Sequence, residues 1–239
     1  MLTATSFAQS ERLFFRRLSK LKFDPACFYD IGASNGTWSS IMADYFPDAR
    51  FEMFEPLSGQ RADYDEVLAH HLGLHPGLRM HRVALSNLNG QADFWNEPNG
   101  FGSSLLTKNV PASEKVEVPV RRLDDYAHEL ELPPPDVIKV DVQGGELRVL
   151  EGGRNTFAHA RILHLETWLR RGYGGETPLL HELIDALRPM DFLLVDIGDF
   201  WRHDSEELYS VDAFFAHRSL IDELRANGAG FPWAPNWTP

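Results

Sequence analysis

A short apolar run that ends in a glycine turn and leads into a helical pattern constrains the fold of this chain most. The run covers residues 26–31, the turn is Gly32-Ala33-Ser34-Asn35-Gly36, and the helical pattern follows over residues 37–46. A strand, a tight glycine turn and a helix N-terminus in this order present backbone N–H groups to a ligand. The segment therefore predicts an α/β domain with a ligand site at its first turn.

Asp30, at the end of this first strand, indicates which kind of ligand would suit the turn. The Gly-x-x-x-Gly spacing from Gly32 to Gly36 differs from the G-x-G-x-x-G of dinucleotide-binding proteins, which disfavours a pyrophosphate. A carboxylate at the strand end could meet an ammonium or a sulfonium group, such as that of S-adenosylmethionine. A glycine-rich first turn also occurs in α/β domains without a cofactor. The residues at the ends of the other strands are therefore needed to decide whether this turn belongs to a cofactor site. We expect a bulky replacement of Gly32 to abolish cofactor binding and leave the fold intact.

Two further acidic residues close later strands. Glu55 follows the second apolar run, where a Rossmann-like unit carries an acidic residue that accepts hydrogen bonds from a ribose. Its alternative role is that of a surface residue before Pro56. Asp141 ends the buried run of residues 136–141 and could instead cap the following helix. Ligands of open α/β sheets bind at the carboxyl ends of strands, so Asp30, Glu55 and Asp141 together indicate a site there.

Apolar periodicity and turn residues predict the remaining elements. The last two strands are expected to pair antiparallel, and Thr177 is expected to be the N-cap of a helix that begins with Pro178. Strands are predicted over residues 78–85, 91–95, 115–120, 161–168, 192–197 and 210–216, and helices over residues 7–21, 63–74, from 123 onward, from 146 and over 177–187.

Three segments outside the acidic strand ends supply further candidates. Residues 83–85, Val-Ala-Leu at a strand end, could line an adenine ring or simply belong to the core. The loop with Ser103 and Ser104 is rich in hydrogen-bonding groups and could lie near the ligand or be an ordinary solvent loop. Alternation along the strand over residues 161–168 places His164 and Glu166 on one face.

Charge and cysteine content exclude several classes of function. The 239 residues carry a formal net charge of −12, which argues against nucleic acid and anionic membrane surfaces as partners. The single cysteine, Cys27, allows no disulfide framework and no cysteine-based zinc site, and its apolar strand predicts a buried thiol. No apolar run reaches the length of a membrane span. We expect a cytoplasmic protein.

The domain plan follows from the same pattern. Residues 26–218 are expected to form one α/β domain, after an N-terminal helical extension over residues 1–25 that covers an edge of it. Residues 219–239 are expected to form an irregular tail rich in tryptophan and proline. This tail could pack on the domain, act as a lid, or join a contact in a homo-oligomer.

With these residues laid out, the chain resembles the FkbM family of S-adenosylmethionine-dependent methyltransferases. One match covers residues 138–152, Ile-Lys-Val-Asp-Val-Gln-Gly-Gly-Glu-Leu-Arg-Val-Leu-Glu-Gly, and its part over residues 139–152 is the most specific. Ser34 is a mild departure, because many relatives have asparagine there. The other matching segments are residues 29–36, 54–56, 83–86, 102–105, 120–125, 165–166, 172–173 and 211–215, in the expected order.

The resemblance implies a class I methyltransferase fold, a Rossmann-like, seven-stranded, mostly parallel sheet with helices on both faces and a reversed last strand. It also implies S-adenosylmethionine as cofactor and O-methylation of a hydroxyl on a sugar or natural product. Residues 30–36, with Gly32, Ala33, Ser34, Asn35 and Gly36, would then hold the methionine end of the cofactor. Glu55 and Pro56 would lie at the ribose, Val83, Ala84, Leu85 and Ser86 at the adenine, and Asp141 and Gln143 at the methyl-transfer zone.

Asp141, His164 and Glu166 are the candidates for a general base, because a hydroxyl is a poor nucleophile. Asp141 ranks first by position and His164 second, because an imidazole titrates near neutral pH. No metal is required, although Asp141 with Glu166 could bind Mg²⁺. Ser103, Ser104 and Tyr173 are expected to contact a small-molecule or glycan acceptor, whose identity the sequence does not give. The alternatives are an NAD-dependent oxidoreductase and a non-catalytic module that binds the cofactor.

Overall fold

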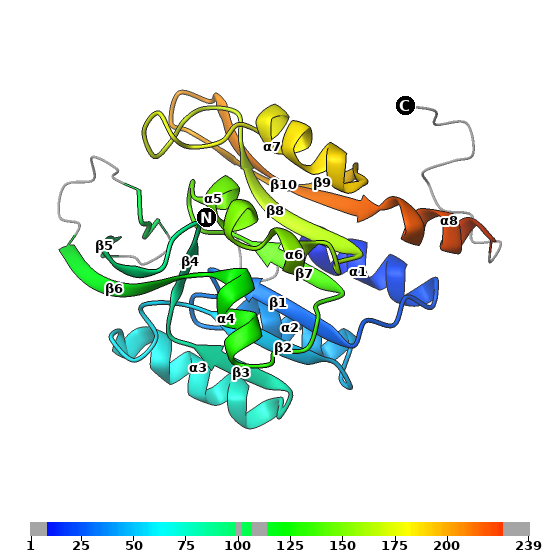
Figure 1. Cartoon of the computed structure of the whole chain (residues 1–239), viewed down its shortest axis with the longest axis horizontal. Helices are drawn as coiled ribbons and strands as arrows, with labels where there is room; N and C mark the ends of the chain where they lie inside the picture. The colour runs from blue at the N-terminus through cyan, green and yellow to red at the C-terminus, as the bar shows by residue number, and fades with distance from the viewer. Residues whose placement is uncertain (1–8, 99–101, 107–113, 227–239) are drawn as a thin grey trace.

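A seven-stranded sheet forms the centre of the molecule (Figure 1). The computed structural model describes residues 9–98, 102–106 and 114–226. The strand order is β3-β2-β1-β7-β8-β10-β9, and only β10 runs antiparallel to its neighbours β8 and β9. These strands are β1 (Cys27–Ile31), β2 (Arg50–Phe54), β3 (Leu78–His81), β7 (Val137–Val140), β8 (Ile162–Trp168), β9 (Phe192–Arg202) and β10 (Leu208–His217). The predicted class I methyltransferase fold is confirmed, with the last strands antiparallel as expected.

Helices cover both faces of this sheet, which explains why its central strands are buried along their whole length. Every residue of β1 and of β7 is buried. Cys27 is among them, as expected from its place in the first apolar run. The helices are α1 (Gln9–Lys20), α2 (Thr37–Tyr45), α3 (Ala62–Leu74), α4 (Leu123–Glu129), α5 (Glu146–Gly152), α6 (Arg154–Phe157), α7 (Leu180–Leu187) and α8 (Arg218–Ala226), with a 3₁₀ turn, η1, over Arg188–Met190.

Each face of the sheet has its own apolar core. Side chains of α1, α2 and α8 pack on one face, and those of α4, α5, α6 and α7 pack on the other. Within the first core, Phe14 of α1 stacks on Phe214 of β10 with ring centroids 4.2 Å apart. Arg17 of α1 pairs with Asp196 of the edge strand β9. The N-terminal helix thus reaches the predicted edge, and it also supplies buried side chains to the main core.

The C-terminal boundary expected between residues 218 and 219 falls inside helix α8. Leu220, Ile221 and Leu224 of this helix are buried in the same core as α1. Residues up to 226 are therefore part of the domain, because their apolar face has a sheet to pack on. The rest of the predicted tail, residues 227–239, lies outside the described residues.

A second sheet of three strands, in the order β4-β6-β5, extends from one side of the main sheet (Figure 1). Its strands are β4 (Ala84–Ser86), β5 (Gly90–Asn96) and β6 (Glu114–Arg122). The predicted single strand over residues 78–85 is wrong. It divides into β3 of the main sheet and β4, which leaves that sheet and pairs parallel with β6. The chain therefore changes sheets next to the ligand end of the domain.

The N-cap predicted at Thr177 is also wrong, because α7 begins at Leu180 after an N-cap at Leu179. Thr177 is instead fully buried, and its side-chain oxygen accepts a hydrogen bond from the backbone N–H of Tyr173 at 2.9 Å. The local sequence Thr-Pro is the same whether the threonine caps a helix or accepts a hydrogen bond from a backbone group outside that helix. The contact with Tyr173 decides between these two roles. Among the helices that the structure describes, none is both long and apolar enough to cross a lipid bilayer.

Candidate active site

The direction in which the chain builds the main sheet reverses between β1 and β7. From β1 the chain adds β2 and β3 on one side, and it later returns to place β7 on the other side. Such a switch point opens a crevice at the carboxyl ends of the two strands, where ligands of open α/β sheets bind. Gly32 follows β1 and Asp141 follows β7, and the backbone N–H of Asp141 donates to the Ile31 carbonyl at 2.9 Å.

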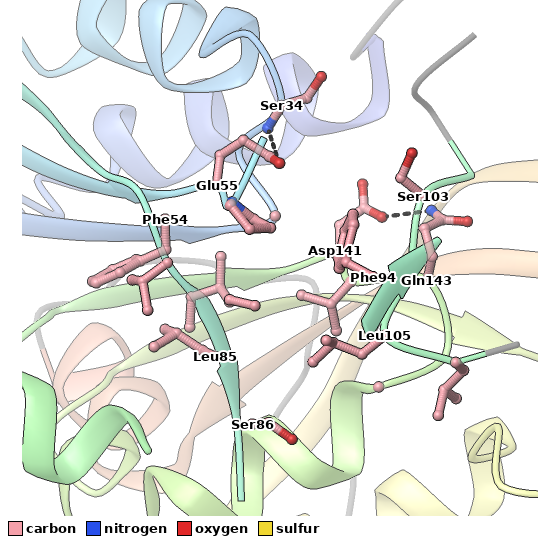
Figure 2. Close-up of a pocket in the computed structure, with 18 of the residues that line it drawn as sticks. Ser34, Phe54, Glu55, Leu85, Ser86, Phe94, Ser103, Leu105, Asp141 and Gln143 are labelled. Carbon is pink, nitrogen blue, oxygen red and sulfur yellow. Dashed lines mark hydrogen bonds between the residues drawn. The ribbon is translucent and has the colours of Figure 1, made fainter. Parts of the chain in front are cut away.

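A cavity of about 740 Å³, open to solvent, lies at this switch point (Figure 2). Its walls come from the ends of β1, β2 and β7, from β4 and β5 and from the loop that follows β5. Its lining residues are Ile31, Gly32, Ser34, Phe54, Glu55, Pro56, Tyr64, Val83, Ala84, Leu85, Ser86, Phe94, Ser103, Leu105, Leu106, Asp141, Val142, Gln143, Gly145 and Arg148.

Glu55 places a carboxylate in the cavity wall with its orientation fixed by backbone donors. Its Oε2 accepts a hydrogen bond from the Ser34 N–H at 3.0 Å (Figure 2). Its Oε1 accepts one from the Leu57 N–H at 2.9 Å. Burial raises the pKa of Glu55 to about 7, against the effect of these two hydrogen bonds. Each carboxylate oxygen can accept a second hydrogen bond, so a ligand with two adjacent hydroxyls could donate to both.

Apolar side chains form the part of the cavity beyond Glu55. Phe54 comes from β2, Val83 and Leu85 from the crossing between the two sheets, and Phe94 from β5. All four are buried, and Figure 2 shows Phe54 and Leu85 on one side of the cavity and Phe94 across from them, near Asp141 and Gln143. A slot of aliphatic and aromatic groups next to an oriented carboxylate suits a flat, uncharged ring attached to a sugar.

A hydrogen-bonded network lies at the other end of the cavity, around Gln143. Its Nε2 donates to Asp141 Oδ1 and to Glu166 Oε2, each at 2.8 Å, and its Oε1 accepts from the Tyr173 hydroxyl at 2.5 Å. Burial, reinforced by the charge of Asp141, raises the pKa of Glu166 well above its ordinary value. Because the Gln143 amide lies between the two carboxylates, it takes the place that a shared Mg²⁺ would need. The Mg²⁺ alternative at Asp141 and Glu166 is therefore not supported.

The cavity also contains backbone that ordinary residues rarely adopt. Ser34 has φ of 51° and Gln143 has φ of 58°, both in the left-handed region. Strain of this kind persists where the surrounding structure imposes it and is concentrated at functional sites. Gly32, with φ of 80°, has a second constraint, because a Cβ there would overlap the Asp141 carbonyl oxygen. The turn after β1 is thus fitted closely to the turn after β7.

Comparison with known proteins identifies this arrangement. The sequence model described as "Methyltransferase FkbM domain" matches residues 30–194, which include every strand end that lines the cavity. The chain belongs to the FkbM methyltransferase family. It is therefore a methyltransferase, and the NAD-dependent oxidoreductase and the non-catalytic module are set aside.

Named relatives of this FkbM methyltransferase agree with the assignment. The chain is 32% identical over 182 residues to "2-O-methyltransferase NoeI" of Sinorhizobium fredii, an alignment that covers 70% of this chain and 72% of NoeI. It is 30% identical over 172 residues to "Methyltransferase sdnD" of Sordaria araneosa, covering 58% of this chain and 65% of sdnD. The crystal structure of methyltransferase FkbM from Methylobacillus flagellatus shares the fold, with a TM-score of 0.51 at 18% identity over 80% of this chain and 44% of that one.

Most of the predicted cofactor-binding residues of this methyltransferase line the cavity, but Asp30 does not. Its side chain is fully buried, accepts a hydrogen bond from Ser39 Oγ at 2.7 Å, and lies 3.2 Å from Lys139 Nζ. The expected direct contact between Asp30 and a cationic ligand is therefore corrected. Burial opposes the Lys139 charge, but Asp30 and Asp141 outweigh it and raise the Lys139 pKa.

Three other members of the predicted first turn also lie outside the cavity wall. Ala33 is buried, and Asn35 Oδ1 accepts hydrogen bonds from the backbone N–H and the hydroxyl of Thr37 at the start of α2. Gly36 is the N-cap residue of α2, with φ of 78°. These residues shape the turn, whereas Gly32 and Ser34 face the cavity.

His164 is not a candidate base in this structure. Its side chain is 2% exposed, stacks on the Phe214 ring at 4.6 Å between centroids, and is absent from the cavity wall. Burial, together with the positive charge of Lys139, lowers its pKa well below the ordinary value. His164 and Glu166 do share a face of β8 as predicted, since they are opposite Phe214 and Asp212 of β10. Glu166 reaches the site only through Gln143, so Asp141 is the one of the three candidate bases that lines the cavity.

The three predicted acceptor contacts differ in position. Ser103 lines the cavity, and its hydroxyl accepts a hydrogen bond from the Glu97 N–H at 3.0 Å. Ser104 is buried and donates to the Gln143 carbonyl at 2.8 Å, so it supports the network and faces no ligand. Tyr173 lines a second hollow of about 590 Å³. The two hollows share Leu105, Leu106 and Arg148 in their walls.

Sequence reasoning found the wall that β4 supplies but missed other parts of the cavity wall. Phe94 comes from β5, Leu105 from the loop that follows it, and Tyr64 from α3. An aromatic residue on the inward face of a strand next to a glycine-rich loop was the available signal for Phe94. No sequence signal marked Arg148 as part of the cavity wall, because a basic residue one turn into a helix is common on protein surfaces.

Proposed function

We propose that this FkbM methyltransferase transfers the methyl group of S-adenosylmethionine to a hydroxyl oxygen on a sugar or another natural product. The observation that carries the proposal is the cavity at the switch point, which combines an oriented carboxylate, an apolar slot and a polar network in one continuous space. This order matches the ribose, the adenine and the methionine end of that cofactor.

The residues present fit the cofactor on structural grounds. Glu55 retains acceptor capacity on both oxygens after its two backbone hydrogen bonds, which suits a ribose diol. Phe54, Leu85 and Phe94 would enclose the adenine, and the absence of a side chain at Gly32 lets the methionine end approach the turn. The bound cofactor would supply an electrophilic methyl group on its sulfonium.

Asp141 is the residue that we assign to the acceptor proton. Its carboxylate lines the cavity and has Gln143 Nε2 at 2.8 Å and Lys139 Nζ at 3.5 Å as its partners. These partners fix the direction of the carboxylate, so it can hold an acceptor hydroxyl in line and accept its proton. Tyr173 and Glu166 keep Gln143 in position, which makes them positioning residues.

The second hollow would hold the acceptor. It adjoins the cofactor cavity through Leu105, Leu106 and Arg148, and it includes Tyr173 and the glycines of the loop that follows β8. The name of NoeI describes transfer to a 2-hydroxyl, and the same chemistry is proposed here for a glycan or small-molecule hydroxyl. The formal charge of −12 disfavours nucleic acid as acceptor, and the single cysteine fits a cytoplasmic enzyme.

Two measurements test this function. Titration calorimetry should show binding of S-adenosylhomocysteine, while NAD should give no heat of binding under the same conditions. A methyl-transfer assay with a panel of glycosides and hydroxylated natural products should show turnover that depends on S-adenosylmethionine. Binding of NAD without binding of the homocysteine product would contradict the cofactor. Turnover only with amine or nucleic-acid acceptors would contradict the acceptor class.

A further inference from the structure

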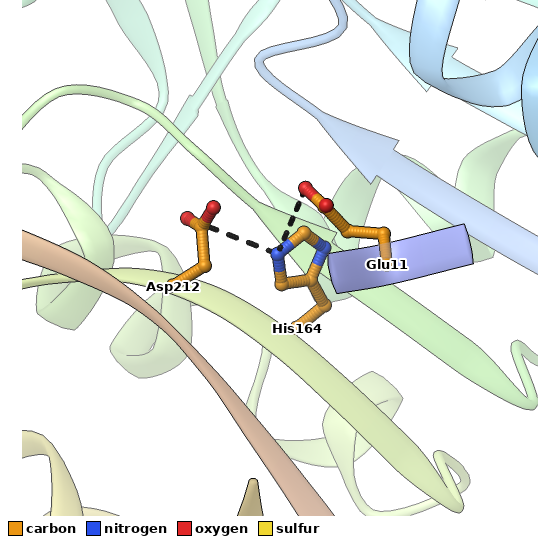
Figure 3. Close-up of side chains that lie close together, drawn as sticks. All are labelled: Glu11, His164 and Asp212. Carbon is orange, nitrogen blue, oxygen red and sulfur yellow. Dashed lines mark ion pairs between the residues drawn. The ribbon is translucent and has the colours of Figure 1, made fainter. Parts of the chain in front are cut away.

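Three ionisable side chains from distant parts of the chain converge beneath α1 (Figure 3). Glu11 comes from α1, His164 from β8 and Asp212 from β10. One donor atom from each lies within 4.8 Å of the other two. His164 Nε2 is 3.8 Å from Glu11 Oε1 and 3.8 Å from Asp212 Oδ1. These separations are too long for hydrogen bonds.

The imidazole at the centre of this cluster has no hydrogen-bond partner on either nitrogen. His164 is 2% exposed, and its Nε2 is directed at both carboxylates (Figure 3). Glu11 Oε2 is buried and also lacks a partner. Buried polar atoms are almost always paired, so several unpaired atoms around one point indicate a missing ligand.

The charges around the cluster point to a cation as that ligand. In the part of the chain that the structure describes, neither Glu11 nor Asp212 has a lysine or arginine within ion-pair distance. The nearby Lys139 is held by Asp30 at 3.2 Å and by Asp141 at 3.5 Å. Glu11 is buried and Asp212 is partly buried, with a side chain that is 25% exposed. Carboxylates removed from water without an ion-pair partner of their own are costly, and a divalent cation between these two would lower that cost.

We propose that Glu11, His164 and Asp212 bind one divalent transition-metal ion, Zn²⁺ or Mn²⁺, which fastens α1 to β8 and β10. An imidazole with two carboxylates suits these ions better than Mg²⁺ or Ca²⁺, which prefer oxygen ligands alone. Donors bound to one Zn²⁺ at ~2.0–2.2 Å lie roughly 3.3 Å apart, so the two 3.8 Å distances from His164 and the separation of the carboxylates, within 4.8 Å, would shorten on binding. A water molecule would complete the coordination.

The proposed site is separate from the cofactor cavity, because none of its three residues lines that cavity. It joins a helix near the start of the described chain to strands more than a hundred residues later. An ion that binds only the folded state stabilises it by mass action, so the site would strengthen the docking of α1. The proposal does not depend on the identity of the methyl acceptor or of the cofactor.

The test uses the full chain after treatment with a chelator and removal of the chelator. Titration calorimetry with ZnCl₂ and with MnCl₂ should show one site on the wild type, whereas MgCl₂ should show none. Glu11→Gln and His164→Gln should each weaken the binding of Zn²⁺ or Mn²⁺ by about tenfold or more. The same ion should raise the melting temperature of the wild type and leave that of the two variants nearly unchanged.

His71→Gln is the matched control, because His70 and His71 lie side by side on α3 with ring centroids 5.8 Å apart and could bind Zn²⁺ on their own. This control should keep the binding and the thermal shift. Circular dichroism establishes that each variant is folded, and Asp212→Asn repeats the test if one of the others is not. The proposal is overturned if the chelated wild type binds no more Zn²⁺ or Mn²⁺ than Glu11→Gln, or if His71→Gln removes the binding.

Discussion

Replacing Glu55 with glutamine tests the proposed cofactor site through one carboxylate. Glutamine keeps the size of the side chain and removes its charge. Glu55 is 7% exposed, and both of its oxygens accept backbone hydrogen bonds from Ser34 and Leu57. The substitution should therefore weaken cofactor binding and also change how the stability of the free protein depends on pH. The two effects have different physical causes and can be measured separately.

The stability effect follows from the pKa of Glu55, which burial raises from 4.5 to about 7. Between these values the folded protein keeps a proton that the unfolded chain releases. The contribution of Glu55 is therefore fully present below pH 4.5 and is lost as pH rises through 7. A difference of this size corresponds to about 3 kcal/mol in the free energy of unfolding. Glutamine does not titrate, so the variant lacks this component.

The binding effect follows from the loss of a charged acceptor for two hydroxyls. Hydrogen bonds to a charged group contribute about 1.5–3 kcal/mol, so the Kd for S-adenosylhomocysteine should rise roughly 10- to 150-fold. Hydroxyl donors favour the ionised carboxylate. The wild type should therefore bind more weakly as pH falls below 7, whereas the Kd of Glu55→Gln should change little with pH.

Urea denaturation of the free protein from pH 4.5 to 8 measures the first effect, and calorimetric titration over the same range measures the second. The wild type should lose stability relative to Glu55→Gln as pH rises, by about 3 kcal/mol over the whole range. If the free energies of unfolding of the wild type and of Glu55→Gln change with pH in the same way, the raised pKa of Glu55 is refuted. An unchanged Kd for S-adenosylhomocysteine would refute the ribose assignment even if the stability profiles differ as expected.

Three other substitutions test the rest of the site. Gly32→Ala should lower the melting temperature by several degrees, because the added Cβ overlaps the Asp141 carbonyl oxygen and φ is 80°; an unchanged melting temperature would contradict the close fit. Asp141→Asn should lower kcat by about 10²-fold or more while the Kd for S-adenosylhomocysteine changes far less; equal losses in both would indicate a cofactor contact and no base. Tyr173→Phe leaves Gln143 Oε1 without its donor, so kcat/KM for the acceptor should fall several-fold while cofactor affinity is retained. An unchanged kcat/KM in steady-state kinetics would mean that the Tyr173 ring packs and its hydroxyl has no positioning role.

The sequence predicted the strand ends of this site well because their signals are local. An apolar run followed by an acidic residue and a turn marks where Glu55 and Asp141 leave the sheet, and parallel strands bring such ends to one edge. The glycine turn after β1 was recognised for the same reason. Its physical basis differs in part from the expectation, because Gly32 is required by the backbone of Asp141 and would not accept a bulky residue with the fold intact.

Side-chain direction and long-range partners could not be predicted. His164 has the residue type of a base, but strand register places it opposite Lys139 and Phe214 and beneath α1. The division of residues 78–85 between two sheets depends on the pairing of β4 with β6, which are far apart in sequence. Periodicity gives the face of a strand and says nothing about which helix covers that face.

The distribution of one positive charge among many acidic groups explains why these carboxylates differ in role. Asp30, Glu55 and Asp141 look alike as acidic strand ends, but only Asp30 and Asp141 lie within ion-pair distance of Lys139. The Asp30 carboxylate is fully buried and pairs with Lys139, so it does not contact the cavity. Asp141 shares the same ammonium and still lines the cavity, which is consistent with the proposed role as the base. Glu55 accepts hydrogen bonds from the backbone N–H groups of Ser34 and Leu57 and lines the cavity, where we propose that it binds paired hydroxyls of the ligand.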